Sequence, residues 1–257
     1  MKPASVTIIG SGTCVPSLKR SSCAVLMELG ETKLLFDSGP GTMHRLLSAG
    51  IEIFDIDFIF YSHFHPDHTG ELVPLIFATK YPDGSRRNTL LTIAGGDGFL
   101  NFINKLKAVY GDWLELPNVM LRFLELDSNG PDSRHFSSFA VETMPMNHQA
   151  ESLGYRITDS NGKSIVYSGD TDTTENLVSL ATGADLLICE SAMPDTLKVP
   201  GHLTPSLAGD MATRANVKKL VLTHLYPECD RFDIASQCRQ TYQGPLVIAE
   251  DLMKIEI

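Results

Sequence analysis

Short apolar runs separated by polar turns recur along the whole chain, and patterns typical of helices alternate with them in each half. Apolar and β-branched runs of this length indicate strands. The expected strands lie at residues 6–9, 24–29, 33–36, 56–61, 90–94, 119–126, 139–144, 152–158, 164–168, 186–190, 219–223 and 246–248. The expected helices lie at residues 41–49, 69–80, 97–110, 174–181 and 204–215, with Asp97 as a helix cap. Because strands precede helices in each half, we expect two sheets with helices packed outside.

The composition is that of an ordinary globular chain with an acidic balance. Its 257 residues are 43 % hydrophobic and 20 % charged, which is typical of soluble domains, and we expect residues 1–257 to form a single α/β domain. The formal net charge of −10 disfavours sequence-blind binding to nucleic acid or anionic lipid, which needs a basic surface. A weak basic cluster at Lys80, Arg86 and Arg87 is interpreted as a solvated face.

The sequence also predicts a cytoplasmic protein that does not span a membrane. The longest stretch without charge, residues 3–18, contains Gly, Ser and Pro, and it is shorter and more polar than the roughly 18 apolar residues of a spanning helix. The first residues lead directly into a strand pattern without the apolar core of a secretory signal. The five cysteines form no Cys-x-x-Cys pair, so we expect free thiols in a reducing compartment.

The most informative segment for function is a histidine-rich loop after the run at residues 56–61. Three of the eight histidines fall within six residues, in the pattern His63-Phe64-His65-Pro66-Asp67-His68. A chain of this composition would contain His-x-His-x-Asp-His by chance in only about 5 of 10,000 cases. A helix-capping loop would explain one histidine at this place but not three.

The spacing of this loop is suited to metal binding. His63 and His65 are two residues apart at the end of a strand and project to one side. Pro66 ends the strand, and Asp67 and His68 then lie where a helix begins. Imidazole and carboxylate groups suit zinc and similar metals. Four such side chains from one loop exceed the needs of one open catalytic ion, which indicates two adjacent ions with further ligands from elsewhere.

This loop resembles the His-x-His-x-Asp-His signature of the metallo-β-lactamase superfamily. His148 resembles the third histidine of that family, Asp170 the bridging aspartate and His224 the final histidine. The segments at residues 10–16 and 36–39 look most like the ribonuclease Z branch. The resemblance extends from Ile8 to His224 and implies a four-layer αβ/βα sandwich.

The resemblance also implies a ligand set for two divalent metal ions. His63, His65 and His148 would hold one ion. Asp67, His68 and His224 would hold the other, and Asp170 would bridge the two. Zinc is the favoured metal, and manganese and iron are alternatives because these ligands accept all three.

Two further residues fit the ribonuclease Z branch in particular. His202 lies in Gly201-His202-Leu203-Thr204 before a helix, and Glu190 ends a buried strand. The resemblance implies that His202 assists the leaving group or stabilises charge and that Glu190 orients it. A metal-bound hydroxide, oriented by Asp67, would attack phosphorus. The expected function is therefore a dinuclear metal-dependent phosphodiesterase.

One departure from the ribonuclease Z pattern leaves the substrate open. Ribonuclease Z enzymes carry a long arm for tRNA between the third histidine and the bridging aspartate, whereas here 170 − 148 leaves 22 residues. A small phosphodiester or an RNA is the expected substrate, and relatives imply a homodimer. Trp113 is interpreted as a packing anchor rather than a base-stacking platform. The alternatives are tRNA 3′ processing, hydrolysis of a lactone, thioester or β-lactam, and a non-catalytic metal- or RNA-binding module.

Overall fold

The computed structural model describes residues 4–80, 87, 89–117 and 119–257. The strands are β1 (Ser5–Gly10), β2 (Ala24–Leu29), β3 (Thr32–Phe36), β4 (Phe58–Phe60), β5 (Leu91–Gly95), β6 (Leu121–Glu125), β7 (Asp132–His135), β8 (Phe139–Pro145), β9 (Leu153–Asp159), β10 (Ser164–Tyr167), β11 (Leu186–Glu190), β12 (Leu220–Thr223), β13 (Leu246–Ile248) and β14 (Met253–Glu256). The α-helices are α1 (Thr42–Ser48), α2 (Pro66–Thr69), α3 (Leu72–Lys80), α4 (Phe99–Tyr110), α5 (Glu175–Ala181), α6 (Pro205–Arg214) and α7 (Ile234–Cys238). Short 3-10 helices are η1 (Ile53–Asp55), η2 (Gly111–Leu114), η3 (Asp195–Leu197) and η4 (Pro227–Arg231).

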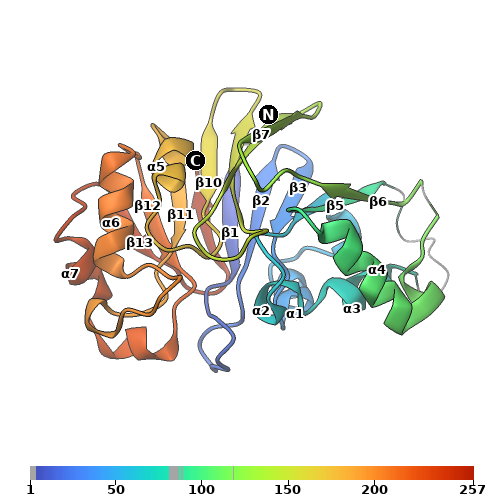
Figure 1. Cartoon of the computed structure of the whole chain (residues 1–257), viewed down its shortest axis with the longest axis horizontal. Coiled ribbons are helices and arrows are strands. Elements are labelled where there is room, and N and C mark those ends of the chain that lie inside the picture. Colours follow the sequence, from blue (N-terminus) through green and yellow to red (C-terminus); the bar gives the residue numbers. More distant parts are fainter. Residues whose placement is uncertain (1–3, 81–86, 88, 118) are drawn as a thin grey trace.

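The strands form two mixed sheets of seven strands each. One sheet has the order β14-β1-β2-β3-β4-β5-β6, and the other has the order β13-β12-β11-β10-β9-β8-β7. The two sheets lie in the centre of the molecule, with α5 and α6 on one side and α1, α3 and α4 on the other (Figure 1). The later strands of each half pair in parallel, so their carboxyl ends meet along one edge.

Three buried apolar clusters separate the layers. Side chains of both sheets, such as Val25 and Ile188, share the central cluster. Leu187, which points to the opposite face from Ile188, packs with residues of α5 and α6. Leu26 packs with residues of α1, α3 and α4. Neighbouring residues thus serve opposite faces, which explains the continuous apolar runs. The layers run helix, sheet, sheet, helix, which confirms the predicted four-layer α/β sandwich.

The predicted helices and strands differ from the observed ones mainly in short or polar segments. The expected helix at residues 69–80 is divided into α2 and α3 around Gly70, and Pro74 lies in the first turn of α3, where proline is tolerated. The prediction that Asp97 caps α4 is wrong: the cap residue is Gly98, and Asp97 accepts a hydrogen bond from Ser128. No apolar or helical pattern in the sequence predicted β7, β14 or α7.

Two predictions about single side chains are wrong. Arg87 is fully buried and donates to the carbonyls of Ile53 and Ile56, so it does not lie on a solvated face; Arg86 lies outside the described residues. Trp113 is 56 % exposed and therefore does not anchor the core.

The thiols agree with the sequence reading. All five cysteines are free, and only Cys14 is exposed. Among the described residues, no helix combines the length and the apolar character that crossing a membrane requires.

Candidate metal centre

The histidine-rich loop connects β4 to α2 and turns sharply because of its proline. Pro66 occupies the first helical position of α2, and the amide of His68 donates to the His65 carbonyl. The amide of Ser38 in turn donates to the His68 carbonyl at 2.7 Å. At Gly39, which lies in the segment after β3, a Cβ atom would lie only 2.1 Å from the Asp67 carbonyl oxygen. A glycine is needed there because the two backbone segments approach each other too closely for a side chain.

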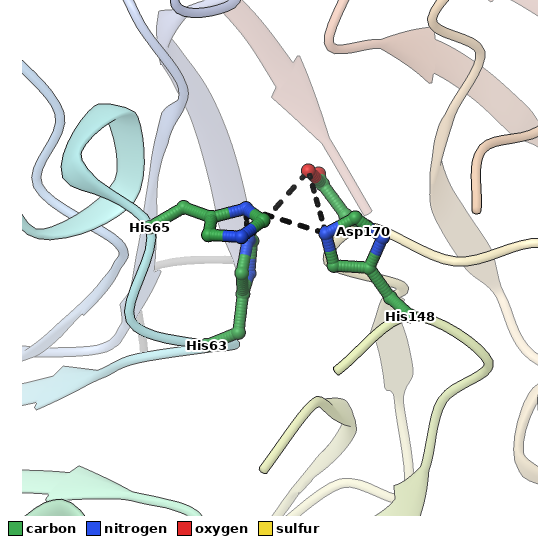
Figure 2. Close-up of side chains that lie close together, drawn as sticks. All are labelled: His63, His65, His148 and Asp170. Atoms are coloured by element: carbon green, nitrogen blue, oxygen red, sulfur yellow. Dashed lines mark hydrogen bonds and ion pairs between the residues drawn. The ribbon is translucent and has the colours of Figure 1, made fainter. Parts of the chain in front are cut away.

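One group of donor atoms gathers His63 and His65 with two residues that lie far away in the sequence. His63 Nε2 lies 2.9 Å from His65 Nδ1, and His148 Nε2 lies 3.3 Å from the same atom. Asp170 Oδ2 is 3.7 Å from His63 Nε2 and 3.9 Å from His148 Nε2. Figure 2 shows these four side chains pointing toward one common space.

A second group gathers Asp67, His68 and His224. His68 Nε2 lies 3.3 Å from His224 Nε2. Asp67 Oδ2 is 3.8 Å from His68 Nε2 and 3.7 Å from His224 Nε2. All three side chains are buried or nearly so, so their donor atoms face one another rather than solvent.

Asp170 lies between the two groups. Its Oδ2 is 3.3 Å from His68 Nε2 in addition to its contacts with the first group, and its Oδ1 is 3.4 Å from His224 Nε2. The side chain is only 3 % exposed. One carboxylate therefore lies close to the donor atoms of both groups.

The donor set fits divalent metal ions. Two donors bound to one tetrahedral zinc at about 2.0–2.1 Å are separated by roughly 3.3–3.5 Å, and the nitrogen–nitrogen and nitrogen–oxygen distances above fall around this value. Within the described part of the chain, the buried Asp170 Oδ1 has no hydrogen-bond partner. Buried polar atoms ordinarily have hydrogen-bond partners, so a buried carboxylate oxygen that faces imidazoles without a hydrogen bond is an arrangement that a cation satisfies.

Hydrogen bonds on the far side of three of the rings, those of His63, His68 and His148, leave the inward nitrogen of each free for a metal. His68 Nδ1 is 2.7 Å from Asp37 Oδ2; because a carboxylate only accepts, Nδ1 carries the proton. Ser62 Oγ donates to Asp37 and accepts from His63 Nδ1 at 3.0 Å. His148 Nδ1 donates to the Gly201 carbonyl at 2.9 Å. Such outer contacts orient metal-binding histidines.

The electrostatics differ between the rings. Burial would lower the pKa of His68, but the charge and hydrogen bonds of Asp170 and Asp37 outweigh it and raise that pKa well above its usual value; a metal ion at His68 Nε2 would replace the proton there. Burial lowers the pKa of His63 well below its usual value and also lowers that of His148, so both rings stay neutral and keep a lone pair for a metal. Burial would raise the pKa of Asp67 and Asp170, but hydrogen bonds and charge from His224 and His68 outweigh it. Both carboxylates are therefore ionised.

His202 and Glu190 form a pair beside this centre. His202 Nδ1 is 2.9 Å from Glu190 Oε1 and 3.9 Å from Asp170 Oδ2. Glu190 also accepts hydrogen bonds from the amides of Thr171 and Ala192. Burial would lower the pKa of His202, but the hydrogen bond and charge of Glu190 outweigh it and raise the pKa. The structure thus brings together all nine residues singled out from the sequence.

Asp37 and Ser62 support the centre, although the sequence alone predicts no role for them. Asp37 is fully buried at a left-handed backbone position (φ 57°) directly after β3. It accepts hydrogen bonds from His68, Ser62 and the Tyr167 hydroxyl. The sequence signal for Asp37 is an aspartate that follows a buried strand and precedes Ser38-Gly39, but its partners come from two distant segments, the histidine-rich loop and β10.

With this fold and cluster in place, the class of protein is defined. The chain matches the model of the beta-lactamase superfamily domain over residues 32–225 and belongs to that family. The family fold and the histidine–aspartate cluster together indicate a divalent metal site.

Two relatives are similar to this chain over nearly its whole length, and one of them is named ribonuclease Z. The chain is 25 % identical to a ribonuclease Z of Archaeoglobus fulgidus, over 98 % of this chain and 97 % of the relative. It is 28 % identical to an uncharacterized protein of Mycobacterium bovis, over 97 % and 92 %.

Two solved structures resemble the whole chain. The short form of human tRNase Z superposes with a TM-score of 0.79 at 26 % identity, over 98 % of this chain and 99 % of that one. The metallo-beta-lactamase fold protein YhfI from Bacillus subtilis superposes with a TM-score of 0.85 at 23 % identity, over 99 % and 100 %. The second likeness shows the fold alone.

Proposed function

We propose that this protein is a metal-dependent phosphodiesterase of the ribonuclease Z type. The observation that carries the proposal is the joint presence of two donor groups around Asp170 and the His202–Glu190 pair beside them. Its relatives named ribonuclease Z and its likeness to human tRNase Z support the same reaction class.

The proposed cofactor is a pair of divalent metal ions, with zinc favoured over manganese and iron. His63, His65 and His148 would hold one ion, and Asp67, His68 and His224 would hold the other. Asp170, which reaches both groups, would bridge them. When bound, the ions supply charge that stabilises phosphate oxygens and lowers the pKa of water.

The protein's own acid and base groups then divide the reaction between them. Water attacks phosphorus, and the bond from phosphorus to the leaving oxygen breaks. Asp67, ionised and 12 % exposed at its side chain, accepts a hydrogen bond from the attacking water and orients it. The water's proton passes to solvent.

His202 serves the leaving group. Its Nδ1 is bonded to Glu190, so Nε2 is left for substrate, and the raised pKa keeps a proton on the ring. His202 transfers this proton to the leaving oxygen and regains one from solvent before the next cycle. Glu190 is proposed to act through His202 by fixing its orientation.

Hydrolysis of bis(p-nitrophenyl) phosphate tests the proposal. We expect activity in metal-loaded protein and its loss in His63→Ala and His68→Ala, whereas His44→Ala, which removes an exposed histidine on α1, keeps it. Undiminished hydrolysis by either of the first two variants would contradict the proposed mechanism.

The substrate class is proposed to be a small phosphodiester or an RNA. Between His148 and Asp170 the chain holds only β9, β10 and their connections, which leaves no place for a tRNA-gripping arm there. The net charge of −10 also disfavours a large RNA such as tRNA, because binding to many phosphates needs a basic surface. A panel with precursor tRNA, cyclic nucleotides, lactones and thioesters separates these classes, and hydrolysis of only the last two would replace the proposal.

We also propose a cytoplasmic homodimer. The free thiols, including the exposed Cys14, support the compartment. A groove of about 600 Å³ lined by Phe64, Phe77 and Trp113 supports an interface, because large exposed apolar surfaces commonly pack against partners. Sedimentation at several concentrations should give a dimer that Trp113→Asp weakens; a monomer throughout would remove the homodimer from the proposal.

A further inference from the structure

Asp172 connects three segments that meet at the candidate metal centre. It follows Asp170 by two residues, and its backbone amide donates to the Asn147 carbonyl at 2.9 Å, next to His148. Its Oδ2 accepts the Gly201 amide at 3.0 Å and lies 2.8 Å from Lys198 Nζ. The segments after β8 and β10 are thereby tied to the loop that carries His202.

Gly201 lies in this loop beside two site residues: it contacts His148 and directly precedes His202. Its carbonyl accepts from His148 Nδ1 at 2.9 Å, which fixes the tautomer and tilt of that ring. Its backbone is left-handed (φ 81°), and a Cβ there would lie 3.1 Å from His148 Nδ1. The next residue is His202, whose position relative to Glu190 follows from where Gly201 is held.

We propose that Asp172 is a positioning residue that holds Gly201, and through it orients both His148 for metal binding and His202 for proton transfer. This inference rests on the proposed function, because it assigns Asp172 a task within that site. Asp172 itself contacts neither the proposed metal space nor the reacting atoms.

Both carboxylate oxygens of Asp172 accept hydrogen bonds, and Oδ2 is the one that holds Gly201. Oδ2 accepts from Lys198 and Gly201, and Oδ1 accepts from the Thr173 amide at 2.8 Å. An asparagine at this position turns a donor NH2 group toward one of these donors. Asp172→Asn therefore preserves size but removes the negative charge beside Lys198 and the hydrogen bonds on one side of the group, and Asp172→Ala removes all of these contacts.

The chain offers a matched control in Asp185, which lies before β11. Asp185 likewise binds a lysine, Lys218, at 2.8 Å and a backbone amide, that of Ser164, at 2.9 Å, but it touches none of the site residues. If Asp172 only stabilised the fold, substitutions at the two aspartates would have similar effects. A partly exposed ion pair adds little to stability, so stability and site effects are separable.

The experiment measures zinc affinity by competition with a chelator, together with kcat and KM for bis(p-nitrophenyl) phosphate at saturating zinc. In Asp172→Ala and Asp172→Asn we expect zinc affinity to fall about tenfold and kcat to fall about 10–100-fold with KM little changed, as for other groups that orient metal ligands. Asp185→Ala and Asp185→Asn should leave zinc affinity, kcat and KM unchanged. Because Asp172→Asn is isosteric, it reports even where Asp172→Ala fails to fold.

Three results would overturn the inference: equal effects at Asp172 and Asp185, a rise in KM alone, or unchanged zinc affinity at Asp172. The zinc affinity of His63→Ala is measured in parallel, because it shows whether the positioning role of Asp172 or the proposed metal site itself has failed. If His63→Ala binds zinc as tightly as the parent, the metal site itself is wrong; if it loses zinc and the Asp172 variants do not, only the positioning role is wrong.

Discussion

The two halves of the molecule build their sheets alike but supply the candidate metal centre differently. In each sheet, three antiparallel strand pairings are followed by three parallel ones. The first half contributes its donors from one loop after β4. The second half contributes single residues, His148 after β8, Asp170 after β10 and His224 after β12.

This difference separates what local chain geometry fixes from what tertiary contacts fix. Pro66 and the start of α2 fix the relative placement of His63 to His68 within a few residues. The placement of His148 depends on Gly201, more than fifty residues later. The concentrated loop is therefore visible in a sequence, and the dispersed donors become visible only once strand ends converge.

The largest expected effect tests whether the two halves are equally necessary. Because each proposed ion needs donors from both halves, His65→Ala and His224→Ala should each lower kcat/KM by about 10³-fold or more. Each variant should also bind one metal ion fewer per chain, as measured by elemental analysis after loading and desalting. Activity that survives in His224→Ala but not in His65→Ala would mean that the first half forms the working site alone.

The next effect separates chemistry from metal binding within the second half. His202 is proposed to donate a proton and not to bind metal, so His202→Ala should lower kcat by about 10²–10⁴-fold with full metal content. The measurement pairs steady-state kinetics with elemental analysis on the same sample. If His202→Ala loses metal as His224→Ala does, His202 is a ligand and the proposed division of roles fails.

A smaller effect is expected from the support beneath the first half. Asp37 holds His68 directly and His63 through Ser62. Asp37→Asn should therefore weaken zinc binding by about 10–100-fold while circular dichroism still reports a folded chain. Zinc affinity equal to that of the parent would show that local chain geometry positions the loop without Asp37.

The same contrast explains how far the sequence could predict this molecule. The bounds of β2, β11 and β13 were predicted correctly because their apolar runs end in turn residues or polar side chains. The polar edge strand β7 (Asp132–His135) carries no apolar signal, so it was missed. The prediction that Arg87 is solvated was wrong because its charge alone does not reveal its buried partners. Its guanidinium donates hydrogen bonds to the carbonyls of Ile53 and Ile56.

The residues of the candidate site were likewise predictable only where a local sequence pattern marks them. The rarity of the histidine-rich loop made it detectable directly, whereas His148 and His224 needed a family resemblance. Asp172 could not have been found in this way, because its role depends on Gly201 and Lys198, and neither contact leaves a pattern in the chain.

The smallest expected effect concerns Asp185, which lies away from the centre. Burial would raise its pKa, but hydrogen bonds from Lys218 and Ser164 lower the pKa from 3.8 to about 2. A carboxyl whose pKa is lowered on folding stabilises the protein above its unfolded pKa, and this contribution is lost as pH falls from about 4 toward 2. Urea unfolding of Asp185→Asn should thus show less stability than the parent at pH 6 and a shrinking difference below pH 4; a constant difference would contradict this.

X-ray diffraction of metal-loaded crystals at the zinc absorption edge tests the central claim most directly. The account predicts two anomalous peaks per chain, one among His63, His65 and His148 and one among Asp67, His68 and His224, with Asp170 touching both. A single peak, or peaks away from these side chains, would contradict it.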